Sequence, residues 1–219
     1  MSTDPFAEHR QRMLAGIAAK TIYACAQLGR AALRPRVLDA LASVPRHEFV
    51  PTSMQGYAYE DSPLPIGCGK TISQPFIVAV MTDLLDVQAT DTVLEVGTGL
   101  GYQTAVLAAL ARRVDSIELI EELAVQAIHR LARQRCTNVD VRVGDGSAGW
   151  PAHAPYDKVI VTAAPAAIPP ALVAQLKPGG RMVLPAGPPE DQQLIVLDKA
   201  LDGSTSTRAI FAVRFSLLA

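Results

Sequence analysis

Three glycines at alternate positions are the residues of this chain best suited to shape a ligand site. They lie in residues 97–101 (Gly-Thr-Gly-Leu-Gly), directly after an apolar run that contains the acidic Glu95. Glycine lets the backbone turn sharply and lets a ligand approach where a Cβ would block it. Turns of this kind at the carboxyl end of a parallel strand bind nucleotides in open α/β sheets. We expect a ligand here, and the alternative is a strand-to-helix turn without one.

The spacing of these glycines separates two classes of nucleotide loop. A dinucleotide-binding G-x-G-x-x-G loop needs glycine at position 102, where this chain has Tyr102. The observed G-x-G-x-G pattern behind an acidic residue resembles the S-adenosylmethionine loop of Rossmann-like methyltransferases. The carboxylate of such a ligand would lie near the unpaired amides of the loop and the following helix. The predicted contacts are Gly97, Thr98, Gly99 and Gly101, with Glu95 accepting hydrogen bonds from the loop amides or from the ligand's ammonium group.

Two acidic residues at later strand ends extend this predicted cofactor site. Glu118 stands about twenty residues after the first glycine, where a carboxylate can accept hydrogen bonds from both ribose hydroxyls, and Leu119 is placed in the site beside it. Asp145 can accept a hydrogen bond from the adenine amino group, while Gly146 lets the ring lie near the chain. The alternatives are a surface charge at a strand end and an ordinary Asp-Gly turn.

The elements that must position these residues follow from the apolar pattern. From residue 92 onward strands and helices alternate, which predicts an α/β fold with a mostly parallel sheet. The last two strands have no crossover helix between them and are predicted to form an antiparallel hairpin. The expected strands cover 92–96, 114–119, 139–143, 158–162, 181–185, 193–198 and 210–217, and the expected helices cover 103–111, 121–134 and 170–176, the last closed by Gly179-Gly180.

The first third of the chain reads differently. Apolar residues at helical spacing predict helices over 5–28 and 35–44, which would form an N-terminal helical cap over 1–45. Residues 57–75 are rich in Gly, Pro and Ser, and a loop of this length inside a compact domain is usually functional or disordered. We expect one domain over 1–219, with a substrate loop region at 46–75 and a Rossmann-like core at 76–219 that opens with a helix over 76–85.

Composition excludes several classes of protein. The net charge is −1, so no overall field attracts nucleic acid. No apolar stretch approaches the length that spans a membrane, and the first residues lack the pattern of a signal peptide. Three cysteines without C-x-x-C spacing predict reduced thiols in a cytoplasmic protein, and four scattered histidines predict no metal. A monomer is the default expectation.

The chain from about residue 46 to 215 resembles the bacterial protein-L-isoaspartate O-methyltransferases. Two of the shared segments, at 64–67 and 71–75, are specific to this family and lie in the long loop region. The segments that carry the resemblance are Arg-His-Glu-Phe-Val-Pro at 46–51, Ala-Tyr-Glu-Asp at 58–61, Leu-Pro-Ile-Gly at 64–67, Thr-Ile-Ser-Gln-Pro at 71–75, residues 95–103, Asp-Gly at 145–146, Val-Thr-Ala-Ala-Pro at 161–165 and Val-Arg-Phe at 213–215.

The resemblance implies a Rossmann-like methyltransferase fold and methyl transfer from S-adenosylmethionine to the α-carboxylate of L-isoaspartyl residues in damaged proteins or peptides. The methyl ester then closes to a succinimide, which starts repair. A carboxyl of this type has a pKa of about 4, so it is already ionised and positioning replaces a general base. Ser73 is predicted to orient the carboxylate, with a helix N-cap as the alternative, and Thr71, Ile72, Ala164 and Lys70 are predicted to bind the substrate.

Several positions depart from the family pattern. Lys70 replaces glutamine, Leu100 replaces serine, Cys68 replaces histidine, and the residues after Phe215 differ from the usual Val-Pro. These departures motivate an alternative in which a related enzyme methylates another peptide carboxylate, such as an aspartate in a dedicated precursor. An NAD-dependent oxidoreductase, an RNA methyltransferase and a non-catalytic cofactor-binding module are less favoured alternatives. Nothing in the sequence lowers the pKa of Cys68, so we expect an inert thiol.

Overall fold

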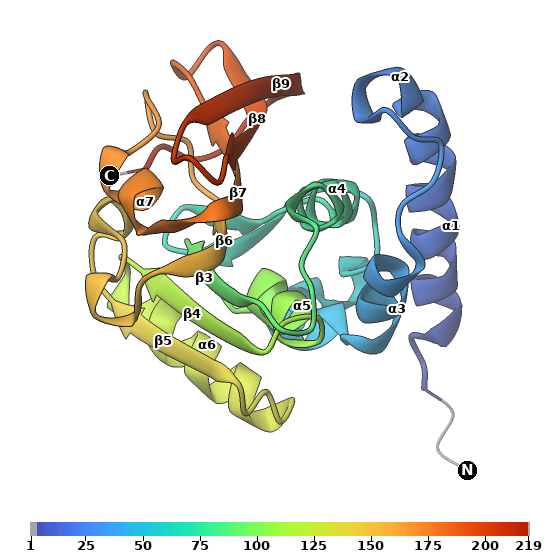
Figure 1. The fold of residues 1–219 in the computed structure, drawn as a ribbon. Coiled ribbons are helices and arrows are strands. Elements are labelled where there is room, and N and C mark those ends of the chain that lie inside the picture. Colours follow the sequence, from blue (N-terminus) through green and yellow to red (C-terminus); the bar gives the residue numbers. More distant parts are fainter. Residues whose placement is uncertain (1–3, 219) are drawn as a thin grey trace.

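A seven-stranded sheet forms the centre of the molecule, with strands in the order β5-β4-β3-β6-β7-β8-β9 (Figure 1). The structure, a computed structural model, describes residues 4–218. The strands are β3 (Thr92–Val96), β4 (Arg113–Glu118), β5 (Val139–Val143), β6 (Tyr156–Val161), β7 (Leu176–Ala186), β8 (Gln192–Lys199) and β9 (Thr205–Val213).

Strand direction divides the sheet into two parts. Strands β5, β4, β3, β6 and β7 are parallel, whereas β8 is antiparallel to both β7 and β9. The prediction of a mostly parallel sheet with an antiparallel C-terminal hairpin is confirmed. Its second strand was placed too late, because β9 spans Thr205–Val213 and not 210–217. Residues 205–209, of which 205–208 are polar, are exposed on this edge strand, where alternation with apolar residues is not required.

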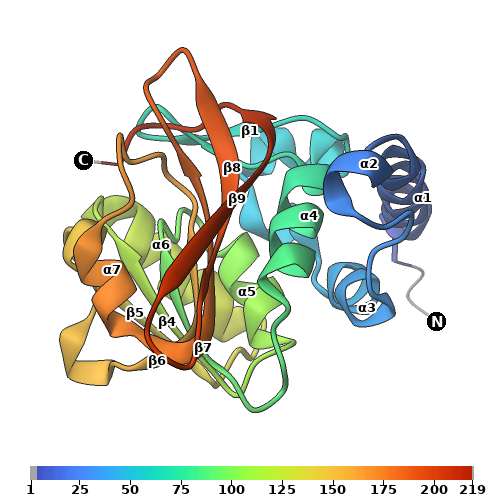
Figure 2. The same ribbon diagram turned by 45° about the horizontal axis from the view of Figure 1, so that its top comes forward.

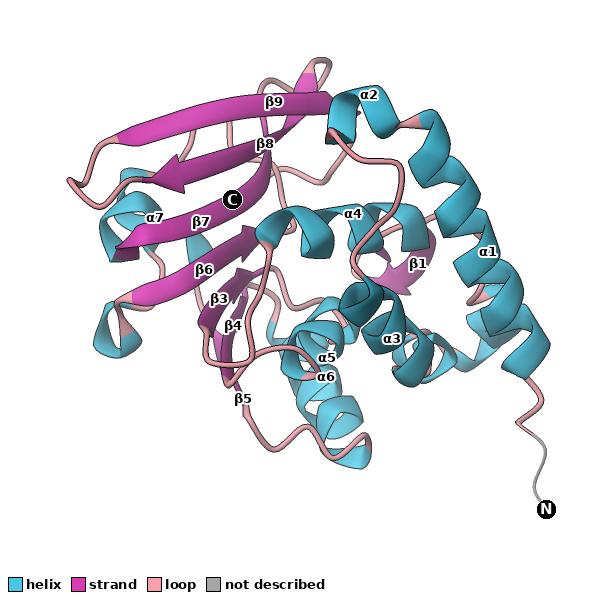
Figure 3. Cartoon of the chain, turned by 45° about the vertical axis from the view of Figure 1, so that its right-hand side comes forward, coloured by secondary structure: helices cyan, strands magenta, loops and turns pink. Residues whose placement is uncertain are grey.

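Helices cover both faces of the sheet. Helices α4 (Pro75–Leu85), α5 (Tyr102–Ala108) and α6 (Glu121–Arg133) lie on one face, and α7 (Pro170–Gln175) packs on the other (Figures 1 and 3). Side chains of β3 alternate accordingly, since Val93 packs in the cluster of α4 while Leu94 packs in the cluster of α7. Helix α7 ends at Gln175, so Gly179 and Gly180 lie within β7 and do not close the helix as predicted. Pro178 explains the earlier stop, because the residues before a proline disfavour helix.

Three helices form the predicted N-terminal cap. They are α1 (Ala7–Tyr23), α2 (Cys25–Leu28) and α3 (Pro35–Ser43). Helix α4 lies between the sheet and both α1 and α3, whereas α2 contacts β9 (Figures 1 and 2). The single helix predicted over 5–28 breaks at Ala24, which leaves helical geometry. The buried face of α1 is Met13, Ile17 and Thr21, whereas the apolar Ile22 and the thiol of Cys25 are exposed.

The region predicted as a long loop contains regular structure. Two 3-10 helices, Arg46–Phe49 and Thr52–Tyr57, precede a small antiparallel hairpin of β1 (Leu64–Gly67) and β2 (Lys70–Ile72). The turn of the hairpin holds Gly67, Cys68 and Gly69 at positive φ. Strands this short carry too few residues to show alternation, which is why periodicity missed them. Within the described residues, no helix combines the length and apolar character needed to cross a bilayer.

Candidate active site

The glycine turn lies after β3, at the point where the strand order reverses. Gly97, Gly99 and Gly101 all have positive φ, of 99°, 57° and 95°. A Cβ on Gly97 would lie 2.2 Å from the Oγ1 atom of Thr162, which donates a 2.7 Å hydrogen bond to the Gly97 carbonyl. A Cβ on Gly99 would lie 3.2 Å from Ile66 Cδ1. The turn therefore depends on glycine both for its conformation and for its close packing on β6 and the β1–β2 hairpin.

A cleft of about 700 Å³ opens beside this turn at the carboxyl ends of the strands. It contains six of the predicted cofactor residues, brought together from three strand ends: Gly97, Gly99, Glu118, Leu119, Asp145 and Gly146. Sequence reasoning missed other lining residues, which are mostly apolar: Ile66, Val96, Ile117, Ile120, Leu123, Thr162, Ala163, Ser216, Leu217 and Leu218.

Three predicted cofactor residues, Glu95, Thr98 and Gly101, do not line this cleft. Thr98 is buried, shares a 2.6 Å hydrogen bond with the Ser116 hydroxyl, and lines a smaller neighbouring cavity. Gly101 is the N-cap of α5, and a Cβ there would lie 3.1 Å from Leu131 Cγ. Thr98 and Gly101 therefore support the conformation of the turn on the side that faces away from the cleft.

Glu118 is held at the floor of the cleft by two backbone amides. Its Oε2 atom accepts a 2.8 Å hydrogen bond from the Gly99 amide, and its Oε1 atom accepts a 3.0 Å bond from the Ile120 amide. The residue is 7% exposed. Each carboxylate oxygen retains acceptor capacity, so the geometry leaves Glu118 able to accept from a ligand diol while it fixes the glycine turn.

Glu95 points away from the turn and into a buried polar network. Its Oε2 atom accepts hydrogen bonds of 2.5 Å from the Thr104 hydroxyl and 2.6 Å from the Ser116 hydroxyl, and its Oε1 atom is buried without a partner among the described residues. The expectation that it accepts from the loop amides is wrong, because alternation along β3 directs its side chain toward α5. Burial raises the pKa of Glu95 to about 7, although the Ser116 and Thr104 hydroxyls oppose the shift.

Asp145 and Gly146 begin a short 3-10 helix that borders the cleft. Asp145 is exposed, and its two carboxylate oxygens accept 2.8 Å hydrogen bonds from the Ser147 amide and hydroxyl. These two bonds lower the pKa of the Asp145 carboxyl. A Cβ on Gly146 would lie 2.3 Å from Val96 Cγ1, so glycine is required there by packing against β3. The ordinary Asp-Gly turn and the ligand contact are therefore compatible.

A second, more open groove of about 1100 Å³ meets the cleft. Thr71, Thr162 and Ser216 line both spaces, so they mark the junction. On one side of the groove lie residues of the loop region and α4, and on the other lies the end of the C-terminal strand. The lining residues are Pro63, Thr71, Ser73, Gln74, Ile77, Thr162, Ala212, Val213, Arg214, Phe215 and Ser216.

Ser73 lines the groove and carries a free hydroxyl. Within residues 4–218 its Oγ atom makes no hydrogen bond, and the N-cap of α4 is Gln74 without a side-chain cap. The helix N-cap interpretation is therefore wrong. Asp61 takes that role instead, because its Oδ1 atom accepts a 2.9 Å hydrogen bond from the Phe76 amide. Ser73 is left half-buried, with its hydroxyl available to a ligand.

The other predicted substrate residues lie in different parts of the structure. Ile72 is buried and lines a small cavity with Ser73, whereas Lys70 is half-buried and lines the cofactor cleft. Ala164 is fully buried and does not line the cleft or the groove; Ala163 lines the cleft in its place. The Ala164 backbone instead pairs with the C-terminal segment, donating to the Ser216 carbonyl at 2.8 Å. Its buried side chain follows from that pairing, which sequence spacing does not reveal.

The C-terminal segment reaches the cofactor cleft as well as the groove. The Leu218 amide donates a 2.9 Å hydrogen bond to the Ala164 carbonyl, and residues 216–218 line the cleft. Gln192 holds the segment by accepting from the Phe215 amide at 2.6 Å and donating to its carbonyl at 3.1 Å. The sequence signalled this segment only through its departure from the family pattern.

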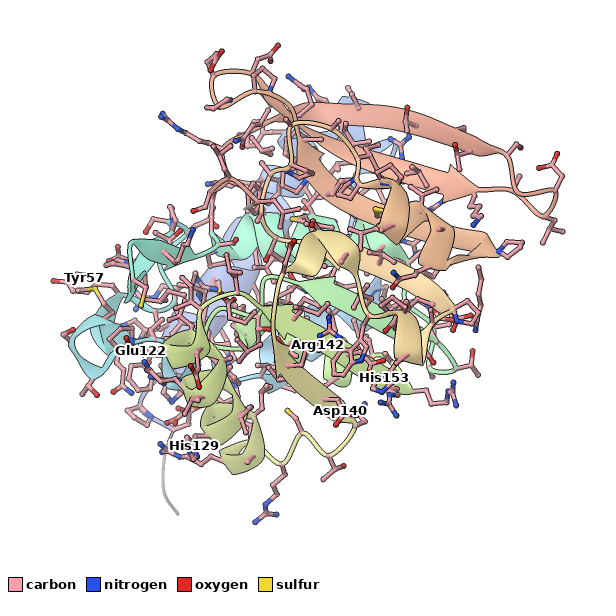
Figure 4. The ribbon with its side chains drawn as sticks, turned by 90° about the vertical axis from the view of Figure 1, so that its left-hand side faces the viewer. Tyr57, Glu122, His129, Asp140, Arg142 and His153 are labelled. Carbon is pink, nitrogen blue, oxygen red and sulfur yellow. The ribbon has the colours of Figure 1, made fainter. Side chains whose placement is uncertain are left out.

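The exposed Cys68 thiol lies 3.7 Å from a carboxylate oxygen of Glu122. Glu122 lies on α6 and is labelled in Figure 4. Partial desolvation and the Glu122 charge raise the pKa of Cys68. A raised pKa keeps the thiol protonated at neutral pH, which agrees with the expectation of an unreactive cysteine.

One group of possible metal ligands occurs within the described residues, far from the cleft. Asp115, Asp140 and His153 lie together near the amino ends of the strands, and Figure 4 labels Asp140 and His153. The Arg113 guanidinium lies among them, with Nε 2.9 Å from Asp115 and Nη2 2.6 Å from Asp140 and 3.2 Å from His153 Nδ1. This arginine already supplies the positive charge that the two carboxylates require.

A sheet that reverses order at β3, a glycine turn after β3, and acidic side chains after β4 and β5 define a Rossmann-like fold with its ligand cleft at the switch point. The family model for protein-L-isoaspartate(D-aspartate) O-methyltransferase matches residues 22–219. The chain belongs to this family, which confirms the resemblance found in the sequence.

Individual relatives agree. Protein-L-isoaspartate O-methyltransferase 1 of Polaromonas sp. (strain JS666) is 63% identical over 218 residues, which cover 100% of this chain and 92% of the relative. The enzyme of the same name from Cupriavidus necator is 54% identical over 213 residues, covering 97% and 82%.

Solved structures share the fold. A solved protein-L-isoaspartate O-methyltransferase is 27% identical with a TM-score of 0.78, covering 92% of this chain, which spans 66% of that protein's length. A Plasmodium falciparum structure described as a putative enzyme of this family, in complex with S-adenosyl-L-homocysteine, has a TM-score of 0.81 at 20% identity and covers 96% of this chain and 98% of its own. Because the two sequences are only 20% identical, this likeness supports the fold alone.

Proposed function

We propose that this chain transfers the methyl group of S-adenosylmethionine to the α-carboxylate of L-isoaspartyl residues in damaged proteins or peptides. One observation carries the proposal: the cleft and the more open groove meet at Thr71, Thr162 and Ser216. A methyl donor in the cleft can therefore point at a carboxylate that enters along the groove. The presence of S-adenosyl-L-homocysteine in the Plasmodium falciparum structure is consistent with this assignment of the cleft.

The lining of the cleft fits a nucleoside that carries an amino acid. Glu118 offers acceptors for a ribose diol, and Asp145 and Gly146 border the space for a purine ring. The apolar residues Ile117, Ile120 and others of the lining give a flat ring a surface to pack on. When bound, the cofactor supplies an electrophilic methyl on a sulfonium.

The groove supplies what a carboxylate nucleophile needs. The substrate carboxyl is ionised at neutral pH, so no side chain has to remove a proton. The Ser73 hydroxyl can donate one hydrogen bond to this carboxylate and fix its direction of approach. Lys70 adds a positive charge at the edge of the cleft, which would favour the approach of an anion. The ester product leaves the enzyme and closes to a succinimide on its own.

A substrate comparison tests the proposal. The purified protein is incubated with S-adenosylmethionine and either an isoaspartyl peptide or the same peptide with normal aspartate, and methanol released from the labile ester is measured. We expect turnover only with the isoaspartyl peptide. Equal turnover on both peptides, or turnover on the aspartyl peptide alone, would support the alternative in which a related enzyme methylates another carboxylate. No turnover on either would contradict the proposal. The monomeric state stays a prediction, which size-exclusion chromatography with light scattering can check.

A further inference from the structure

Arg46 is the largest fully buried side chain among the described residues, and it is charged. It belongs to the 3-10 helix Arg46–Phe49 at the start of the loop region. Its Nε atom donates a 2.7 Å hydrogen bond to the Ala58 carbonyl, and its Nη2 atom donates a 2.8 Å bond to the Ser73 carbonyl. One guanidinium therefore joins both ends of the loop region, and one of its two acceptors is the backbone of Ser73.

The seat of this guanidinium is the first residue of α5. The Cζ atom of Arg46 lies 4.7 Å from the centre of the Tyr102 ring, a cation–π geometry. Tyr102 is buried and lines a small cavity together with Ser73 and Gly97. Tyr102, which replaces the third glycine of a dinucleotide-binding loop, therefore packs against the arginine that binds the Ser73 carbonyl. Arg46 itself lines neither the cleft nor the groove.

Burying a charged guanidinium is unfavourable, so the position of Arg46 requires a reason other than packing. Burial lowers the pKa of Arg46 to about 10, so the group stays charged at neutral pH and its desolvation is unfavourable. Its Nη1 atom and the Tyr102 hydroxyl are enclosed without a hydrogen-bond partner among the described residues. An apolar side chain would fill the same space without this penalty, but it could not hold two carbonyl groups in a fixed orientation.

We infer that Arg46 is a positioning residue, whose hydrogen bond to the Ser73 carbonyl sets the direction of the Ser73 hydroxyl toward the substrate carboxylate. The inference rests on the proposed role of Ser73. Because the reaction needs no proton transfer, alignment is the main contribution that the protein can make. A small displacement of residue 73 would then lower turnover, although the cofactor cleft, which Arg46 does not touch, would still bind its ligand.

The test is a double-mutant cycle on kcat with an isoaspartyl peptide. We expect Arg46→Met to lower kcat at least tenfold while the Kd for S-adenosylhomocysteine changes less than threefold. In a Ser73→Ala background, the same substitution should lower kcat by less than a further twofold, because the hydroxyl that it positions is already absent. Arg46→Lys, which keeps the charge and one donor, should recover part of the loss.

Arg130 on α6 provides a matched control. Its Nη1 atom donates to the carbonyls of Glu48 and Val50, at 2.5 and 3.3 Å, so it also ties the segment after residue 46 to the core but does not contact residue 73. Arg130→Met should leave kcat within twofold. If Arg46→Met does not fold, Arg46→Lys is used to build the same cycle.

The outcomes separate the inference from the proposed function. Wild-type turnover on the isoaspartyl peptide reports the function. With that turnover present, losses that multiply across Arg46→Met and Ser73→Ala would mean that Arg46 acts independently of the Ser73 hydroxyl, and the inference fails. An unchanged kcat in Ser73→Ala would overturn it as well, because nothing would remain for Arg46 to position.

Discussion

The two sides of the active site are built in different ways. The cofactor cleft is centred on the backbone turns at the ends of β3, β4 and β5, and two backbone amides fix its acidic residue Glu118. Apolar side chains, the β1–β2 hairpin and residues 216–218 complete its lining. The substrate groove is made by side chains and by segments far apart in the chain, since Ser73 faces residues 212–216 across it. The cleft therefore depends on sheet geometry, whereas the groove depends on a few long-range contacts such as Arg46 with Ser73.

This difference predicts different responses to substitution. Changes in the cleft should alter cofactor affinity in proportion to how far they displace the backbone. Changes in the groove should alter turnover and leave cofactor affinity intact. Variants of each side, measured for both properties, can confirm or contradict this separation.

The largest effect is expected for Gly97→Ala. A Cβ there would lie 2.2 Å from Thr162 Oγ1, and φ is 99°, so the turn has to move. We expect the Kd for S-adenosylhomocysteine, measured by calorimetry, to rise at least 100-fold, or about 2.7 kcal/mol. Gly203→Ala is the control for backbone strain alone, because Gly203 has φ of 86° and open space around it. A Gly97→Ala protein that binds the ligand normally would contradict the packing argument.

Next in size is Ser73→Ala. Loss of a hydrogen bond to a charged group costs about 1.5–3 kcal/mol, so we expect kcat/KM for the isoaspartyl peptide to fall roughly 10- to 100-fold. The Kd for S-adenosylhomocysteine should stay within threefold. Ser53→Ala, on an exposed 3-10 helix of the same region, is the control and should have no effect. Equal losses in turnover and cofactor affinity would show that the two sides are not separate.

A smaller, pH-dependent effect is expected for Glu95→Gln. The pKa of Glu95 is about 7 in the folded protein and 4.5 in its ordinary state. The folded state thus binds the proton more tightly, so the stabilisation is complete below pH 4.5 and is lost as pH rises through 7. From pH 6 to 8 this carboxyl should remove roughly 1 kcal/mol from the free energy of unfolding. Urea unfolding of the variant at both pH values should lack this part of the slope, whereas Glu122→Gln, an exposed control, should keep it.

The cofactor side was largely predictable from sequence because its requirements are local. The alternating glycines, the acidic residue at a strand end and the Asp-Gly pair are each motifs of a few consecutive residues. Six of the residues predicted from these motifs line one cleft. Local rules failed where a strand residue could point to either face of the sheet. Glu95 precedes the turn in sequence, yet the pleat of β3 sends it to Thr104 on α5.

The groove could not be derived in the same way. Ser73 was predicted only from the family-specific segment at 71–75. The hairpin at 64–72 was not predicted, because strands this short show no periodicity. The family resemblance predicted Ala164 in the substrate site, but its backbone pairs with Ser216 and its side chain is buried. That pairing joins residues about fifty apart, and no pattern along a single chain encodes it.

The smallest effect is expected for Asp145→Ala, and it tests whether a side chain at the rim of a backbone-built cleft contributes to affinity. Asp145 already binds the Ser147 amide and hydroxyl, so a contact with an adenine amino group would be an additional one, worth about 1 kcal/mol. We expect the Kd for S-adenosylhomocysteine to rise about fivefold with little change in Tm. Asp202→Ala removes the same local motif, in which Asp202 binds the Ser204 amide and hydroxyl, from a turn remote from the cleft. If both variants shift Tm equally and neither changes the Kd, Asp145 serves only as a cap for its turn.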